Sequence, residues 1–344
     1  MQHEIQDPAP LLKDDGSLYE AGYAKYPIMV YDRSQIRAGK SRIKEWDYYL
    51  IQNDRYAVAL TADDNSYMGM MSVSFIDLEK GTEITKSVIL PFTFGRIKLP
   101  ASSAYGDVVY ESRKVKLSFT HEAEGRRLKV LFRKFKDKQD FECDFLLTEE
   151  PRDSMVIATP FADKPKAFYY NQKIIAMRAS GTVWHDRKKY KFTSGNSFGL
   201  LDWGRGVWTY DNTWYWSAAQ GMVDGRRFGF NLGYGFGDTS AASENMLFVD
   251  GTAHKLEGVE FQIPKDKDGK DDYLSPWRFT STDGRCELEF RPILDRKAKI
   301  SLIVIMSDQH QVFGRFSGEV TLDDGKKMVI KDLLGFAEKV RNKW

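Results

Sequence analysis

Carboxylates, an arginine and aromatic rings crowd one stretch of the chain, residues 198–246. Asp202 and Arg205 lie three residues apart in the run DWGRG, and Asp238 and Glu244 follow in GFGDTSAASENM. Aromatic rings offer rigid apolar faces, and buried charges persist only when they are paired or hydrogen-bonded. This mixture predicts a small-molecule pocket with a few aimed polar groups. Its expected ligand-binding side chains, besides Arg205, are Trp203, Trp208, Trp214, Trp216, Asn231, Tyr234 and Asn245.

The glycines around Arg205 suggest how the first two charges could meet. Gly204 and Gly206 allow backbone geometry that a β-carbon would forbid, so we expect Asp202 and Arg205 to point inward together. Arg205 would then hold a carboxylate or hydroxyl of the ligand while Asp202, kept ionised by the guanidinium, orients it. A structural ion pair that pins a tight turn explains the same residues equally well.

The two later carboxylates differ in context. Asp238 precedes Thr239 and Ser240, a pattern typical of a cap with side-chain to backbone bonds around a turn. Glu244 instead stands just before the apolar run Met246–Phe248, where desolvation would raise its pKa and suit it to act as a general acid. With Arg205 assigned to Asp202, Glu244 is the predicted acid, and Asp202 and Asp238 are further catalytic candidates.

Three functional hypotheses follow from these groups. The leading one is acid-assisted hydration, cyclisation or isomerisation of an apolar or aromatic ligand, with tryptophan faces stabilising developing positive charge. The second is a carbohydrate-active hydrolase that pairs Asp202 or Asp238 with Glu244 in a tryptophan-lined cleft. The third is a non-catalytic binding protein in which the acids serve only the fold. The residues alone leave all three open.

No metal or cofactor is expected. The five histidines show no metal-ligand spacing, and neither an HExxH motif nor a Cys-His cluster is present. His185 could assist proton transfer, but a strand-end histidine with ordinary hydrogen bonds is the more common case. Cys143 and Cys286 each stand in an alternating pattern and are predicted to be small core residues. GYGFG lacks the third glycine and the strand–helix context of a dinucleotide fingerprint.

The elements that must position these groups are β-strands, which a period-two alternation of apolar and polar residues predicts. Leu128–Phe132, Phe141–Leu147 and Cys286–Phe290 alternate apolar and polar residues, as in strands with one buried face. Asp-Gly pairs at 224–225, 250–251, 283–284 and 324–325 are typical of hairpin turns. The prediction is an all-β chain of sandwich or barrel architecture, in which only the final GFAEKVRNKW could form a short helix.

A weak internal repeat divides the chain in two. Trp46–Tyr49 and Trp214–Trp216 each open a strand, and the later elements follow in the same order in both halves. The prolines between residues 151 and 165 would interrupt strand pairing. We therefore expect an N-terminal β module over residues 1–165, which begins with an irregular segment, and a C-terminal module over residues 166–344 that carries the site.

The balance of charge excludes some partners. The chain has 344 residues, with Lys+Arg 51 against Asp+Glu 49, and the two signs are interspersed. This gives little support to a nucleic-acid footprint. No apolar run approaches the roughly 18 residues needed to span a bilayer, and the N-terminus has no secretory pattern. A cytoplasmic protein with a small-molecule ligand and no integral membrane segment is expected; its oligomeric state is open.

Several strings also resemble a known family. WDYYLIQNDRYAVALTADDNSYMG, KAFYYNQK, GLLDWGRGVW and NLGYGFGDTSAASENM are similar to DUF2804, a family of unknown function, and the resemblance covers nearly the whole chain. A looser similarity links Gly181, Trp184, Asp186 and the tryptophan-rich strand before Asp224-Gly225 to the hydroxyneurosporene synthase and AttH-like proteins. That similarity implies two lipocalin-like β-barrel modules packed together. The Asp-His pair of those proteins reads here as His185-Asp186, and DWGRG and GFGDTS have no counterpart there, so hydratase activity is not carried over.

Overall fold

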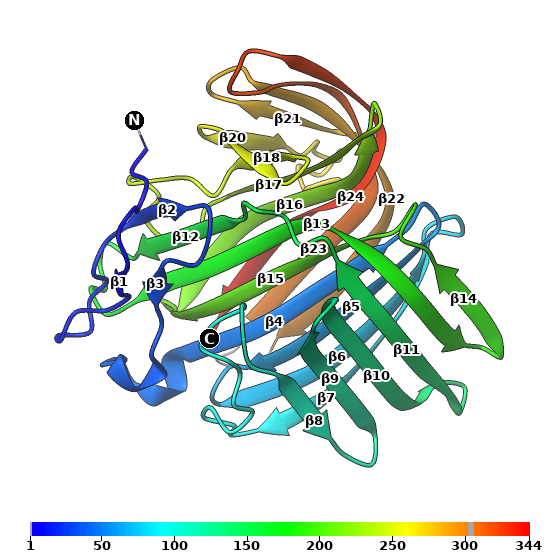
Figure 1. Ribbon diagram of the computed structural model, residues 1–344, viewed down its shortest axis with the longest axis horizontal. Coiled ribbons are helices and arrows are strands. Elements are labelled where there is room, and N and C mark those ends of the chain that lie inside the picture. The colour runs from blue at the N-terminus through cyan, green and yellow to red at the C-terminus, as the bar shows by residue number, and fades with distance from the viewer. Residues whose placement is uncertain (1, 302–305) are drawn as a thin grey trace.

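Strands make up nearly all of the regular structure. The computed structural model describes residues 2–301 and 306–344, and the helices in this part of the chain are two short 3-10 turns, η1 (Arg33–Gln35) and η2 (Lys40–Arg42). The strands form two curled antiparallel sheets that pack together (Figure 1). This confirms the predicted all-β fold of two packed modules.

The first sheet is built from strands within residues 22–207. Its main path runs β7-β6-β5-β4-β15-β13-β11-β10-β9-β8, with β2, β12 and β14 attached beside it. Its strands are β2 (Gly22–Ala24), β4 (Ile43–Gln52), β5 (Tyr56–Asp64), β6 (Met68–Asp77), β7 (Thr82–Pro91), β8 (Val108–Glu111), β9 (Val115–Glu122), β10 (Gly125–Lys136), β11 (Gln139–Thr148), β12 (Met155–Pro160), β13 (Phe168–His185), β14 (Lys188–Phe192) and β15 (Phe198–Val207). A small parallel pair, β1 (Ala9–Pro10) and β3 (Met29–Val30), lies apart from it.

The second sheet takes the rest of the chain in the order β19-β18-β17-β16-β24-β23-β22-β21-β20. Its strands are β16 (Asp211–Val223), β17 (Arg226–Tyr234), β18 (Met246–Val249), β19 (Thr252–Lys255), β20 (Val259–Gln262), β21 (Trp277–Ser281), β22 (Cys286–Ser301), β23 (Met306–Thr321) and β24 (Lys327–Lys343). The sheets meet where β13 and β15 pack against β16 and β17. Figure 1 shows the long strands of both sheets running through the middle of the molecule.

The chain changes sheet between β15 and β16. The expected module boundary, between residues 165 and 166, does not coincide with this change, because β13, β14 and β15 all pair within the first sheet. Prolines mark interruptions of pairing, but only the long-range partners of a strand decide which sheet it joins.

The C-terminal helix prediction is wrong. GFAEKVRNKW forms the end of β24, which pairs with β16 on one side and β23 on the other. Glu338, Val340 and Asn342 are buried, whereas Arg341 between the last two is exposed. This is the alternation of a strand, and pairing on two sides overrides a local helical preference.

The turn predictions agree with the backbone. Asp224-Gly225 joins β16 to β17 and Asp250-Gly251 joins β18 to β19, with positive φ at all four residues. Two consecutive positive φ angles are typical of the type I′ hairpin turn. Cys143 and Cys286 are free and buried. Among the described residues, no helix has the length and apolar character to cross a membrane.

Candidate functional site

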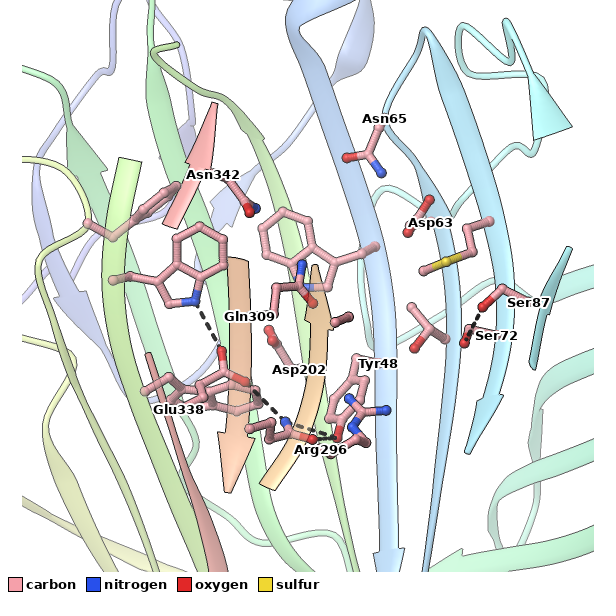
Figure 2. Close-up of a pocket in the computed structure, with 18 of the residues that line it drawn as sticks. Tyr48, Asp63, Asn65, Ser72, Ser87, Asp202, Arg296, Gln309, Glu338 and Asn342 are labelled. Carbon is pink, nitrogen blue, oxygen red and sulfur yellow. Dashed lines mark hydrogen bonds between the residues drawn. The ribbon is translucent and has the colours of Figure 1, made fainter. Parts of the chain in front are cut away.

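A cavity of about 390 Å³ lies between the two sheets (Figure 2). Strands β4–β7, β13 and β15 of the first sheet line one side, and β16 and β22–β24 of the second sheet line the other. Its size falls within the usual range for small-molecule sites, about 300–1,000 Å³. Both halves of the chain contribute walls, whereas the sequence analysis assigned the site to the module over residues 166–344.

One wall of the cavity is a cluster of aromatic rings. Trp46 stacks on Tyr169, with centroids 6.1 Å apart and planes 13° apart, and meets the edge of Trp208 at 5.3 Å. Phe236 touches both Trp208 and Trp214, at 4.9 and 5.4 Å between ring centroids. Rings that hold one another in edge-on and stacked contacts form a rigid apolar surface. The wall can therefore hold a flat apolar ligand with little loss of side-chain freedom.

An ion pair lies beside these rings. Lys173 Nζ lies 2.8 Å from Asp202 Oδ2 and 3.7 Å from the centre of the Trp216 ring. Asn171 donates from Nδ2 to the other carboxylate oxygen, Oδ1, at 2.6 Å. Lys173 and Asp202 are both buried, and each satisfies the charge of the other.

The predicted pairing of Asp202 with Arg205 is wrong. Arg205 donates from Nη2 to Asp47 Oδ1 at 2.9 Å, and its guanidinium also binds the carbonyl oxygens of Trp46 and Pro100. DWGRG lies inside the regular strand β15, where successive side chains alternate between faces. A spacing of three therefore sends Asp202 into the cavity and Arg205 to the opposite face.

Trp203 shares the far face with Arg205, whose guanidinium carbon lies 4.2 Å from the centre of the tryptophan ring. Neither residue lines the cavity. Gly204, on the cavity face, lies against Trp46: a β-carbon at this position would overlap the Trp46 ring. The glycine expected to bend the backbone instead makes room for an aromatic side chain.

Glu244, the acid expected from the sequence, lines the cavity. Burial raises the pKa of its carboxyl, and the nearby charge of Lys173 opposes that rise. Asn231 donates from Nδ2 to Glu244 Oε2 at 3.3 Å and accepts from Trp216 Nε1 at 2.7 Å. Asn231 thus orients two cavity residues from behind the wall.

A second buried acid, Glu338 on β24, was missed by the sequence analysis. Trp214 donates from Nε1 to Glu338 Oε1 at 3.0 Å, and Gln311 donates from Nε2 to Oε2 at 3.1 Å (Figure 2). The same Gln311 nitrogen lies 3.4 Å from the Tyr48 hydroxyl. Burial raises the pKa of Glu338 to about 7, although the Trp214 hydrogen bond and the charge of Lys173 favour the carboxylate.

Comparison with protein families shows which family the chain belongs to. The family model described as "Domain of unknown function (DUF2804)" matches residues 2–344. The chain belongs to the DUF2804 family. No curated protein matches its sequence.

Solved structures share the fold of this DUF2804 protein. Kievitone hydratase from Nectria haematococca superposes with a TM-score of 0.53 at 11% identity, over 97% of this chain and 98% of that chain. An AttH-like protein from Nitrosomonas europaea gives a TM-score of 0.53 at 13% identity, over 90% of this chain and 96% of that chain. At such low identity the likeness concerns the fold alone.

The remaining expected site residues of the DUF2804 protein lie outside the cavity lining. Asp238 is a turn cap that accepts the Ser240 N–H at 3.0 Å, and its hydrogen bonds to Ser240 lower its pKa. Tyr234 stacks on Tyr215, with ring centroids 4.4 Å apart. Asn245 accepts the N–H of Gly233 at 2.7 Å and has a structural role. Asp238 and Glu244 therefore do not form a pair in the cavity.

The first sheet gives the cavity a polar side. Thr61, Asp63, Ser72 and Ser87 of β5–β7 line it, and Arg296 of β22 adds a positive charge from the second sheet. Burial, together with the adjacent charge of Asp64, raises the pKa of Asp63 to about 8. Within residues 2–301 and 306–344, no group of three His, Cys, Asp or Glu side chains is placed to hold a metal ion.

Proposed function

We propose that this DUF2804 protein binds a small, largely apolar or aromatic molecule between its sheets and adds water to it by acid-assisted chemistry. The observation that carries the proposal is the Glu338 carboxyl, which is buried in the wall of a tryptophan-lined cavity with its pKa raised to about 7. A carboxylic acid that is partly neutral at neutral pH can deliver a proton to an alkene or carbonyl.

The groups around Glu338 suit the two stages of such a step. The neutral carboxyl gives its proton to one carbon of a double bond, and the π electrons of that bond form the new C–H bond. Trp214 Nε1 and Gln311 Nε2 already point at the carboxylate that results and would stabilise it. The tryptophan faces would stabilise the positive charge left on the second carbon, which then bonds to a water oxygen. The proton that this water loses returns to a carboxylate, so the net change is addition of one water.

Glu244 is the alternative acid, as expected from the sequence. It is buried beside the same cavity, and its pKa is also raised. Asp202 is less suited to proton transfer because it is the ion-pair partner of Lys173, and a neutral Asp202 would leave that buried positive charge without its partner. We assign Asp202 to holding Lys173, and either Glu338 or Glu244 to the proton.

The fold supports this class of chemistry without specifying it. One protein with the same fold is named a hydratase of kievitone. The carbohydrate hydrolase hypothesis has less support, because Asp238 lies outside the cavity and Asp202 is committed to Lys173. A purely binding role would leave Glu338 as an orienting hydrogen-bond acceptor.

The test is addition of labelled water. The protein is incubated with a panel of aryl alkenes and conjugated carbonyl compounds in water containing heavy oxygen, and mass spectrometry finds products that have gained one labelled water. Glu338→Gln should lower the rate roughly 100-fold or more, the usual contribution of a general acid. Asp238→Asn, a change at a turn cap outside the cavity lining, is the matched control and should keep the full rate.

The outcomes separate the hypotheses. If only Glu244→Gln abolishes the reaction, Glu244 is the acid. If both glutamine variants keep the rate of the native protein, acid catalysis by these residues is wrong. Binding of panel members without any gain of label would leave a non-catalytic binding protein.

A further inference from the structure

Asp63 is a carboxyl that the proposed reaction does not use. It comes from β5 of the first sheet, whereas Glu338 comes from β24 of the second, and Figure 2 shows the two on different sides of the cavity. Only 8% of Asp63 is exposed. Across the ladder it stands between Trp46 of β4 and Met70 of β6, both of which also line the cavity.

One oxygen of Asp63 lacks a partner. Its Oδ1 is buried and makes no hydrogen bond to any described residue. Asp64, the next residue, is the contrast: its oxygens accept from Ser66 N at 2.9 Å, Thr93 Oγ1 at 2.7 Å and Gly95 N at 2.8 Å. Burying an unsatisfied polar atom is unfavourable, and native proteins rarely do so without a reason. The unpartnered Oδ1 of Asp63 therefore indicates that a polar group of a ligand forms the missing hydrogen bond.

We propose that Asp63 binds the ligand through its neutral carboxyl, which donates a hydrogen bond to an uncharged oxygen such as that of an aryl ketone. The inference rests on the proposed ligand site and adds the chemical class of its occupant. The carbon frame lies on the tryptophan wall, and a carbonyl or similar acceptor reaches the first sheet.

Burial is the main cause of the raised pKa of Asp63. The charge of Asp64 adds to the rise, whereas Lys44 and the polar groups of Met70 and Asn65 oppose it. Lys44 of β4 is the cation that favours the carboxylate, but it is itself buried, donates to the Asn65 carbonyl oxygen at 3.2 Å and lies 4.1 Å from the Tyr67 ring centre. Burial lowers the pKa of Lys44 to about 7, so its support for the ionised form of Asp63 fades as pH rises. The other charged or titratable groups nearby are Asp64 on β5, Tyr67 before β6, Arg42 in η2, Glu83 on β7, and Arg296 and Lys297 on β22.

The test compares two probes of matched shape, acetylnaphthalene and ethylnaphthalene, by titration with tryptophan fluorescence. Neither has an isolated alkene for the proposed reaction to hydrate, so binding is measured apart from catalysis. The native protein should prefer the ketone by about tenfold, the gain expected from one net hydrogen bond. Asp63→Ala should abolish that preference. Asp63→Asn should keep it, because the amide N–H₂ can also donate.

Dependence on pH gives a second readout. In the native protein the ketone preference should disappear as pH rises through about 8, the raised pKa of Asp63. In Asp63→Asn the ketone preference should persist at high pH. Both proteins contain Lys44, so the difference between them does not arise from the titration of Lys44. The same comparison tests the proposal if Asp63→Ala does not fold.

Two failures can be told apart. If both probes bind but Asp63→Ala keeps the ketone preference, or the native preference is independent of pH, the role of Asp63 is overturned and the ligand site stands. If neither probe binds the native protein at any pH, the proposed ligand site fails, and the role of Asp63 fails with it.

Discussion

Asp202 and Arg205, three residues apart on β15, carry their charges to opposite faces of the first sheet, where each has a different partner. Asp202 binds Lys173 in the cavity wall, and Arg205 binds Asp47 behind it. The sheet thus holds two buried ion pairs back to back. Only the Lys173–Asp202 pair touches the cavity, so its removal should affect both stability and ligand binding.

Lys173→Met should destabilise the fold by about 3–5 kcal/mol, the range for breaking one side of a buried ion pair. The variant leaves the Asp202 carboxylate without its cation and removes the contact with Trp216. Urea unfolding measures the loss. The double variant Lys173→Met with Asp202→Asn should recover most of it, because no uncompensated charge remains. A loss below about 1 kcal/mol in the single variant, as for an exposed pair, would show that water reaches Asp202.

Glu338→Gln should change how stability depends on pH. The pKa of Glu338 rises from an ordinary value of 4.5 to about 7 on folding. Below 4.5 the carboxyl is neutral in both states. As pH rises toward 7 it ionises in the unfolded chain first, so the native protein loses stability that the glutamine variant keeps. Relative to Glu338→Gln, the free energy of unfolding of the native protein should fall by on the order of 3 kcal/mol between about pH 4 and about pH 8. Parallel curves for the two proteins would contradict the raised pKa.

Trp214→Phe should raise the pKa of Glu338 further. The substitution keeps an aromatic ring but removes the Nε1 donor that favours the carboxylate. A hydrogen bond to a charged group contributes about 1.5–3 kcal/mol, which corresponds to an upward shift of roughly one to two pH units. Carbon NMR of labelled glutamate side chains would follow the titration. Trp277→Phe is a suitable control, because Trp277 lies in the core of the second sheet and bonds the Tyr273 carbonyl oxygen. It should leave the Glu338 titration unchanged.

Gly204→Ala should displace part of the aromatic wall of the cavity. The added methyl group would overlap the Trp46 ring and push it out of its stack with Tyr169. Overpacking of this kind costs about 1–3 kcal/mol. The variant should also bind the naphthalene probes more weakly, and titration followed by calorimetry or fluorescence measures this affinity. Gly195→Ala is the control, because a β-carbon there meets no atom within 4 Å. Equal effects of the two substitutions would show that Trp46 can relax freely.

The strands and the face that each side chain takes could largely be predicted from local sequence. Trp214 and Trp216 stand two residues apart, and both do line the cavity. The same rule, applied to Asp202 and Arg205, would have separated them. The glycines suggested a turn, but the pairing of β15 with β4 and β13 makes it a strand.

The partners across the cavity could not be predicted in the same way. Lys173, Asp63 and Glu338 come from β13, β5 and β24, and only the long-range order of strands brings them together. The helical interpretation of the last ten residues also meant that Glu338 and Asn342 were not recognised as cavity residues. Alternation of Phe336, Glu338, Val340 and Asn342 with polar or small residues was the available signal.

Because both sheets line the cavity, a molecule bound there would contact both sheets and connect them. Any ligand that binds only the folded state adds to its stability, by about 2.7 kcal/mol at a hundred times its dissociation constant. Here that gain would not stay within one sheet, because opening either sheet releases the same molecule. Occupancy would thus tighten the coupling between distant strands, and withdrawal of the ligand would allow each sheet to open more independently of the other.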